Sequence, residues 1–137
     1  MAAKKRNIKY LRVIDANLNR AREGLRVIED TARFITGNNK AFEELRKARH
    51  TLDKITRNIY PELLSQRDSR ADAGRAIKEE NTRKGMKSLL SANFRRIEES
   101  LRVLEEYAKI ISRGAAPVFK RLRFKMYTLE KEFLVKN

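Results

Sequence analysis

The amino-acid sequence repeats itself, and this internal repeat limits the folds open to the chain more than any other feature. Residues 15–35 align with residues 91–111 at an offset of 76, with 10 identities in 21 positions. At an offset of 77 the match extends further along the chain: Leu45, Arg46, Thr51, Leu52 and Lys54 fall on Leu122, Arg123, Thr128, Leu129 and Lys131. A unit repeated in this way is one supersecondary element that buries its apolar face against its copy.

Hydrophobic periodicity predicts that each unit is a helical hairpin. The first helix of the first copy has apolar residues at spacings of three and four: Leu11, Ile14, Leu18, Ala21, Leu25, Ile28, Ala32 and Ile35. The second copy repeats the spacing with Leu90, Phe94, Ile97, Leu101, Leu104, Ala108 and Ile111. One face of an α-helix has this period. Gly37 and Gly114 follow these two helices, and we expect each glycine to end its helix in the left-handed conformation.

We therefore predict one all-α domain over residues 1–137, a four-helix bundle made of two repeated helical hairpins. The hairpins span about 9–64 and about 85–135, and a long central connection spans 65–84. The connection reads as irregular because it follows Pro61 and contains Gly74, and a short helix around 77–83 is one option within it. The sequence leaves open whether the second hairpin runs in the same direction as the first.

The charge of the chain predicts an anionic partner. The sequence has 33 Lys and Arg residues against 18 Asp and Glu residues, a formal charge of +15. Nucleic acid, anionic lipid and a phosphorylated small molecule all fit that charge. We expect most of the aromatic side chains in the core, with none exposed among basic residues, so nucleic acid is the less favoured partner.

Other features of the composition restrict the chemistry and the location. The chain has no Cys and a single His50, which excludes disulfide frameworks, thiolate metal sites and multi-histidine metal sites. No apolar run approaches the roughly 18 residues of a membrane span. We expect a protein of the cytoplasm without a membrane segment, and the sequence leaves a homodimer open.

A second stripe of residues, beside each apolar stripe, has a small residue at its centre. Its members are Asn17, Arg20 and Gly24 in the first copy and Asn93, Arg96 and Ser100 in the second. A glycine within a helix costs about 1 kcal/mol relative to alanine, so Gly24 needs an explanation. The favoured explanation is close helix packing, in which the two asparagines pair to fix the register; the other explanation is a groove that binds a ligand.

Charged residues near the stripes have two interpretations each. Arg49 occupies a position where the second copy has Met126, so it either binds a phosphate or pairs with a glutamate of the first helix. Glu23, Arg26 and Glu29 recur as Glu99, Arg102 and Glu105, a spacing typical of ion pairs within a helix. The connection contains Arg67, Asp68, Ser69 and Asp72, which could bind magnesium and phosphate or cap a helix.

Three separated motifs resemble one protein family. They are DANLNRAREGLRVIED at 15–30, RDSRADAG at 67–74 and ANFRRIEESLRVLEEY at 92–107. In this order they are similar to the small hydroxymethylpyrimidine phosphate kinases of thiamin biosynthesis, all-helical proteins found alone or fused to thiamin phosphate synthase. The likeness spans nearly the whole chain.

The resemblance implies that ATP phosphorylates 4-amino-5-hydroxymethyl-2-methylpyrimidine monophosphate to the diphosphate, with Mg²⁺ as cofactor and a functional link to the synthase. It also implies which residues form the site, because all of them except Arg49 lie in the motifs; Arg49 is added as a phosphate-binding candidate from its place on the second helix. The roles we expect are catalytic for Arg20, Arg96 and Asp68, substrate-binding for Asn17, Asn93, Glu23, Glu99, Arg49 and Arg67, and metal-binding for Asp68 and Asp72. Two alternatives are a basic helical nucleic-acid-binding module and a non-catalytic partner of thiamin enzymes.

Overall fold

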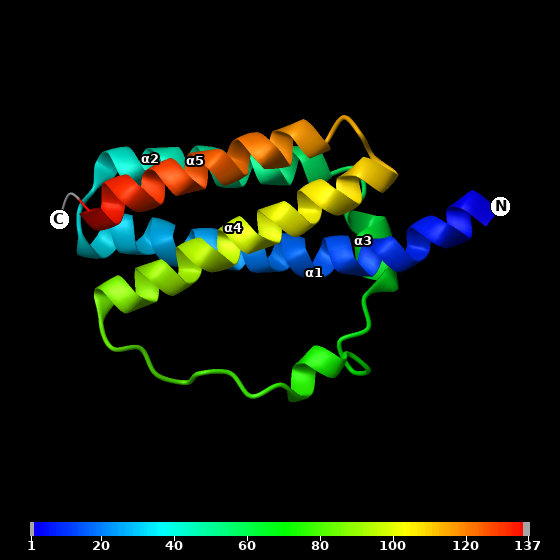
Figure 1. The fold of residues 1–137 in the computed structure, drawn as a ribbon, viewed down its shortest axis with the longest axis horizontal. Helices are drawn as coiled ribbons and strands as arrows, with labels where there is room; N and C mark the ends of the chain where they lie inside the picture. The colour runs from blue at the N-terminus through cyan, green and yellow to red at the C-terminus, as the bar shows by residue number, and fades with distance from the viewer. Residues whose placement is uncertain (1, 136–137) are drawn as a thin grey trace.

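The protein folds into a four-helix bundle without a strand in residues 2–135, which confirms the predicted fold class. The structure is a computed structural model that describes the backbone of residues 2–135 and the side chains of residues 9–135. The long helices are α1 (Ala2–Asp30), α2 (Asn39–Thr56), α4 (Met86–Ile111) and α5 (Ala116–Val135) (Figure 1). No helix in this part of the chain is long and apolar enough to cross a membrane.

Neighbouring helices of the bundle run antiparallel. The two longest helices, α1 and α4, make the most extensive contact, while α2 packs on α1 and α5 packs on α4 (Figure 1). The helices α2 and α4 point the same way, so the second hairpin is reversed relative to the first. The chain must therefore return along the whole bundle before α4 begins, which explains the length of the connection.

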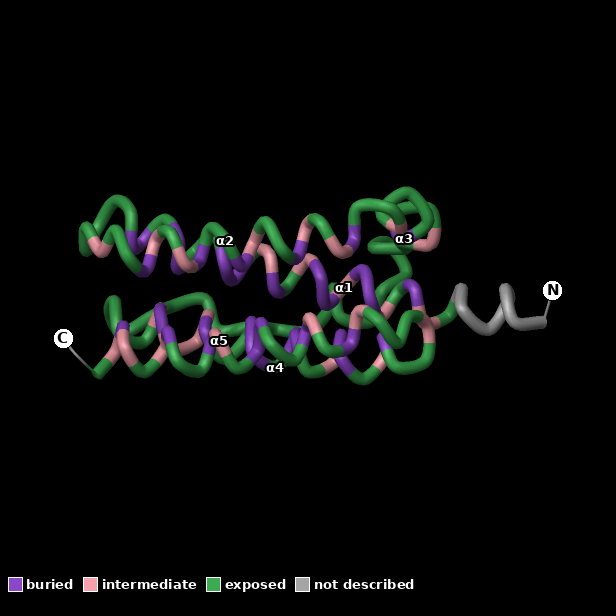
Figure 2. Tube along the Cα trace, turned by 90° about the horizontal axis from the view of Figure 1, so that it is seen from above, coloured by how far each residue is buried: buried purple, intermediate pink, exposed green. Residues whose placement is uncertain are grey.

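The core consists of the two predicted apolar stripes and their partners on α2 and α5. Figure 2 shows buried positions recurring along all four long helices. The exception is Ile35, which is 66% exposed although the stripe predicted it to be buried. It lies in the π-helical turn η1 (Thr31–Ile35), where Thr36 N–H bonds Thr31 O at 3.0 Å. A π-helical turn has more residues than an α-helical turn, so the 3.6-residue period no longer applies there.

Two expectations about helix ends and the connection are corrected. Gly37 has φ +65° as predicted, but Gly114 is not among the glycines with positive φ in the described residues. At that end, Ser112 leaves the helix with φ −152°, so no left-handed cap is required. The short helix expected around 77–83 is absent. In its place a 3₁₀ turn, η2 (Ala73–Ala76), forms a few residues earlier, where Asp72 caps it by accepting from Gly74 N–H.

The expected absence of exposed aromatic side chains among basic residues is wrong on α5. Phe124 is 52% exposed and Tyr127 is 41% exposed, and the exposed Lys120 and Lys131 lie on either side of them along the helix. The two rings meet edge to face, with centroids 5.6 Å apart. The heptad stripe of α5 already fills the core with other apolar residues, so these two rings remain outside.

Candidate functional site

Gly24 allows α1 and α4 to approach closely. A Cβ atom at this position would lie 2.7 Å from Cγ1 of Ile97 and 3.2 Å from the backbone oxygen of Asn93. Contacts that short do not occur between real side chains, so a larger residue would separate the helices. The equivalent residue of α4, Ser100, is also buried. Close packing is therefore the reason for the small residues, as favoured from the sequence.

The two asparagines do not pair with each other, which corrects the expected register contact. Asn17 Nδ2 donates to Val13 O at 2.9 Å, and Asn93 Nδ2 donates to Leu89 O at 2.8 Å. Each amide thus bonds the preceding turn of its own helix. The Asn17 carbonyl oxygen remains directed outward, where it accepts a hydrogen bond from Arg20 Nη1 at 3.3 Å. Asn17 therefore orients the exposed guanidinium group of Arg20.

The connection is attached to both central helices through arginines. Arg67 donates two hydrogen bonds to Asp15 of α1, from Nε at 2.8 Å and from Nη2 at 2.7 Å. These bonds raise the pKa of Arg67 above its ordinary value. Further on, Glu79 lies 3.9 Å from Nη2 of Arg96 on α4. The segment that begins at Arg67 therefore passes from α1 to α4 along the side away from α2 and α5 (Figure 1).

The start of the connection and α1 enclose a polar pocket, which we call the connection pocket. Its polar lining includes Arg12, Asp15, Asn19, Arg67, Asp68 and Asp72. Asp68 accepts from Ala71 N–H at 3.1 Å and Asp72 accepts from Gly74 N–H at 2.8 Å, so one oxygen of each carboxylate is already engaged. The capping interpretation is thus confirmed for Asp72. Both carboxylates also line the connection pocket.

The donor set of the connection pocket suits magnesium that arrives with a phosphate. In residues 9–135 no group of three or more His, Cys, Asp and Glu side chains is arranged to hold a metal. Three carboxylates line the connection pocket, and because that of Asp15 is paired with Arg67, those of Asp68 and Asp72 remain for a metal. Magnesium is commonly bound by one or two carboxylates together with substrate phosphates and water. The residues present fit that mode and do not fit a cage made by protein ligands alone.

A second pocket lies between α1 and α2, and we call it the hairpin pocket. It is lined by Asn19, Arg22, Glu23, Arg26 and Arg49. Arg49 donates from Nε to Glu29 at 2.8 Å and from Nη2 to the same carboxylate at 3.1 Å, which raises the pKa of Arg49. Of the two interpretations of Arg49, the structure contains the pair with a glutamate of the first helix. Arg22 likewise pairs with Asp53 of α2 at 3.0 Å.

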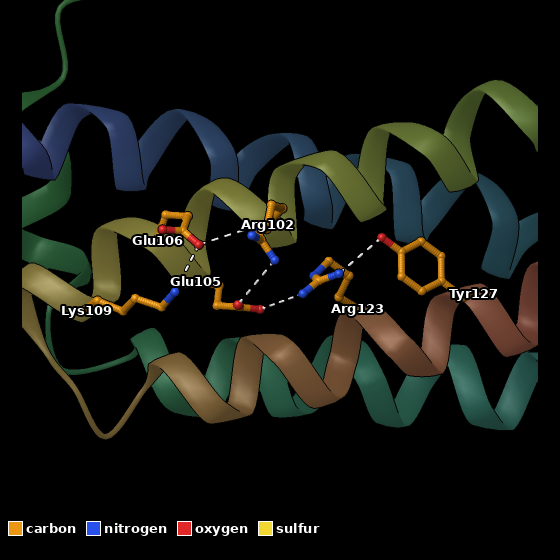
Figure 3. A network of polar contacts seen from close by, with 6 residues as sticks. All are labelled: Arg102, Glu105, Glu106, Lys109, Arg123 and Tyr127. Atoms are coloured by element: carbon orange, nitrogen blue, oxygen red, sulfur yellow. Dashed lines mark hydrogen bonds and ion pairs between the residues drawn. The ribbon is translucent and has the colours of Figure 1, made fainter.

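The second copy contains a matching buried ion pair between α4 and α5. Arg123 Nη2 donates to Glu105 at 3.1 Å, and Arg123 Nη1 donates to the Tyr127 hydroxyl at 3.3 Å. Glu105 occupies the position of Glu29 in the repeat. Figure 3 shows that this pair continues into a network along α4: Arg102, Glu105, Glu106, Lys109, Arg123 and Tyr127. Buried carboxylates paired with arginine are therefore common to both hairpins.

The two copies differ about two helical turns before these pairs on α1 and α4. Where the first copy has the ion pair of Arg22 with Asp53, the repeat places Glu98 and Glu130. Glu98 is 8% exposed, and its Oε2 atom is buried without a hydrogen-bond partner. Burial, together with the adjacent Glu130 carboxyl, raises the pKa of Glu98 to about 8. A protonated carboxyl group in the second copy thus replaces a cation in the first.

The structure brings some of the predicted site residues together and separates others. Arg67, Asp68 and Asp72 share the connection pocket, and Glu23 and Arg49 share the hairpin pocket. The remaining residues line neither pocket in the described part of the chain: Asn17, Arg20, Asn93 and Arg96 follow the contact between α1 and α4, and Glu99 is exposed on α4. Of these residues, Arg20 lies one helical turn from Ala16, which lines the connection pocket.

Four residues of these pockets were missed from the sequence: Arg12, Asp15, Asn19 and Arg22. Asp15 had a detectable signal, since it adjoins Ile14 in the apolar stripe and lies within the first motif. A carboxylate beside a core position needs a cationic partner, and here the partner is Arg67, 52 residues away in sequence. No sequence pattern distinguishes the other three, of which Arg12 is exposed and Asn19 and Arg22 are half-buried.

Comparison with known proteins places the chain in a family. The model of the ThiD2 family matches residues 12–132. A protein of Nostoc punctiforme named thiamine-phosphate synthase is 43% identical over 125 residues, which cover 90% of this chain and 35% of that protein. A protein of the same name from Synechocystis is 40% identical over 125 residues, 90% of this chain and 36% of that protein. The chain thus spans about a third of the length of these relatives. No solved structure matches it.

Proposed function

Since the chain belongs to the ThiD2 family, we propose that it is an ATP-dependent kinase of thiamin biosynthesis. The proposed reaction converts 4-amino-5-hydroxymethyl-2-methylpyrimidine monophosphate to the diphosphate. The observation that carries the proposal is the path of the connection, which brings Asp68 and Asp72 to α1 and then reaches Arg96 on α4. Two carboxylates and arginines of both copies thereby border one face of the bundle.

Transfer of the phosphoryl group requires that the phosphate charges are neutralised and that the two substrates are positioned. The nucleophile is an oxygen of the acceptor phosphate, which is already largely ionised at pH 7 because its second pKa is about 6. That oxygen forms a bond to the γ-phosphorus of ATP, and the bond from the γ-phosphorus to the bridging oxygen breaks, so that ADP leaves. No strong protein base is required, in keeping with a chain that has no Cys and one His. Catalysis in such transfers comes mainly from positioning and electrostatic stabilisation.

The proposed roles follow from the contacts of each residue. Arg20 and Arg96 hold the acceptor phosphate, because their guanidinium groups are exposed on the face where the connection passes. Asn17 orients Arg20, and Asn93 contacts the pyrimidine or an oxygen of the substrate. Asp68 and Asp72 would hold magnesium, which neutralises phosphate charge when it is bound.

Four further residues have less direct roles in the proposal. Arg67 fixes the connection to α1 through Asp15 while lining the connection pocket. Glu23 and Arg49 border the hairpin pocket, where they contact one of the two substrates. Glu99 occupies the position of Glu23 in the second copy, three residues after Arg96, and we propose that it orients Arg96.

The relatives named thiamine-phosphate synthase are about three times as long as the segment they share with this chain. We assign the coupling reaction that their name describes to the remainder of those proteins and only phosphoryl transfer to the shared segment. The test is an assay of ADP release from MgATP with and without the pyrimidine monophosphate. The proposal requires release that depends on the monophosphate and on magnesium, without formation of thiamin phosphate.

A second candidate function is binding of single-stranded nucleic acid, favoured by the exposed Phe124 and Tyr127 between basic residues of α5. Exposed rings on a basic surface are the usual platform for stacked bases. The discriminating measurement is titration with labelled single strands at rising salt. Binding that persists at physiological salt and weakens in Phe124→Ala supports this function, whereas binding lost with modest salt reflects only the net charge of +15.

A further inference from the structure

The connection pocket and the hairpin pocket meet on one helix face. Asn19 lines both pockets, so they adjoin on one face of α1, and we call the two pockets together the α1 furrow. Arg12 borders one end and Arg26 borders the other, 14 residues further along the helix. At a rise of about 1.5 Å per residue this distance is about 21 Å. The furrow is long enough for an extended polyanion, and Asp68 and Asp72 lie at the Arg12 end.

The second copy of the repeat cannot form an equivalent furrow. The repeat places Arg95 where the first copy has Asn19, and Glu98 where it has Arg22. Glu98 lies buried beside Glu130 instead of presenting a cation. An anion bound there would face the two carboxyl groups of Glu98 and Glu130, where the first copy has the ion pair of Arg22 with Asp53. The two hairpins share their fold and their buried ion pairs but differ in this surface.

We infer that the α1 furrow binds the polyphosphate of the nucleotide donor and that only the first hairpin supplies this site. The inference rests on the proposed kinase function, which leaves the position of the nucleotide open. The terminal phosphate would lie at the end with Asp68 and Asp72, where magnesium can bridge it to the protein.

Of the arginines in the hairpin pocket, Arg26 can receive a phosphate without breaking a strong ion pair. Arg26 has a side chain 59% exposed, and its Nη1 atom lies 3.8 Å from Glu29, a contact too long for a hydrogen bond. Glu29 keeps its two hydrogen bonds from Arg49 when Arg26 turns outward. The furrow also contains acidic side chains, so binding should depend on magnesium for the phosphates nearest Asp68 and Asp72.

The repeat supplies a matched control for testing the furrow. Arg102 of α4 is the equivalent of Arg26, with a side chain 56% exposed and an Nη1 atom 3.7 Å from Glu105. The two substitutions Arg26→Ala and Arg102→Ala therefore remove the same group from similar settings, except that Arg102 also lies 3.4 Å from Glu106. We would measure binding of inorganic tripolyphosphate with magnesium to the full chain by calorimetry, and confirm by circular dichroism that both variants remain folded.

The inference predicts that Arg26→Ala weakens tripolyphosphate binding roughly tenfold, as expected for one charge-assisted contact, and that Arg102→Ala changes it less than twofold. Asn19→Asp should also weaken binding, because it places a carboxylate at the junction of the two pockets. Equal effects of Arg26→Ala and Arg102→Ala, or no binding by the wild-type chain, would overturn the furrow. Kinase activity of the wild-type chain is measured separately. Binding of tripolyphosphate without kinase activity would refute the proposed kinase function but would retain the polyphosphate site.

Discussion

Arg49 of α2 donates two hydrogen bonds to the buried carboxylate of Glu29, although the repeat has Met126 at the position of Arg49. The second copy buries the equivalent carboxylate of Glu105 and pairs it with Arg123, which is equivalent to Arg46. The cation thus comes from neighbouring turns of the second helix in the two hairpins. The buried carboxylate is the constant feature, and either turn of the partner helix can neutralise it.

Replacing Arg49 by Met tests whether this arginine only compensates Glu29. Loss of one member of a buried pair leaves an uncompensated charge and costs about 3 to 5 kcal/mol. We expect the lower end of that range, because Arg26 remains near Glu29. Urea unfolding measures this cost, with Arg123→Met as the matched variant of the second copy. If Arg49 also contacts substrate, Arg49→Met should lower activity more than Arg123→Met at equal folded fraction; equal losses would leave Arg49 a purely structural role.

Replacing Gly24 by Ala should destabilise the protein although alanine is the better helix former. The gain in helix propensity is about 1 kcal/mol. The new Cβ would lie 2.7 Å from the Ile97 side chain, and overpacking of this kind costs typically 1 to 3 kcal/mol. We expect a lower free energy of unfolding in urea. Gly114→Ala is the control, since nothing lies within 4 Å of a Cβ there, and it should be neutral or slightly stabilising.

The raised pKa of Glu98 predicts a pH dependence of stability. Its pKa is about 8 in the folded protein, well above the value of about 4.3 in an unfolded chain. The folded state therefore holds a proton that the unfolded state releases between these values. The stabilisation is fully present below about pH 4 and is lost as the pH rises towards 8, with a slope of up to about 1.4 kcal/mol per pH unit.

Glu98→Gln provides the control for this pH dependence, because glutamine keeps the shape of a protonated carboxyl group without titrating. Unfolding in urea at several values between pH 5 and pH 8 should show a smaller slope in Glu98→Gln than in the wild-type chain. The groups around Glu98 are Glu130, Glu99 and Arg95, all of which remain in the variant. A slope unchanged by the substitution would assign the pH dependence to other groups.

Asp68→Asn tests the proposed magnesium site. Asparagine can still accept the hydrogen bond from Ala71 N–H, so the local turn should persist and the melting temperature should change little. Loss of one carboxylate should raise the magnesium concentration needed for half-maximal activity by roughly tenfold. A change in melting temperature with an unchanged magnesium requirement would mark Asp68 as a capping residue.

The sequence predicted the helices and their core well, because a periodic pattern repeated over many residues averages out local exceptions. It could not give the direction of the second hairpin, since the pattern of α4 is the same in either direction. Gly114 and the 3₁₀ turn at Ala73–Ala76 show that local structure outside the long helices was predicted less well. There a single cap or one extended residue such as Ser112 decides the local structure.

The candidate site was only partly predictable for a related reason. Arg67, Asp68 and Asp72 lie close together in sequence, so they were candidates for one site, although the sequence did not predict the pocket that they line. The bonds from Arg67 to Asp15 and from Arg49 to Glu29 join distant segments whose facing sides depend on how the helices are rotated. Half-buried residues such as Asn19 and Arg22 became candidates only when the pockets were seen on α1.

The most direct test of the account is transfer of label from [γ-³²P]ATP by the purified chain. With magnesium and the pyrimidine monophosphate, the account predicts labelled pyrimidine diphosphate, and it predicts strongly reduced labelling by a folded Arg20→Ala or Arg96→Ala variant. Folded wild-type protein that forms no labelled diphosphate from pure substrate, at any magnesium concentration, would contradict the assignment of this chain as a kinase.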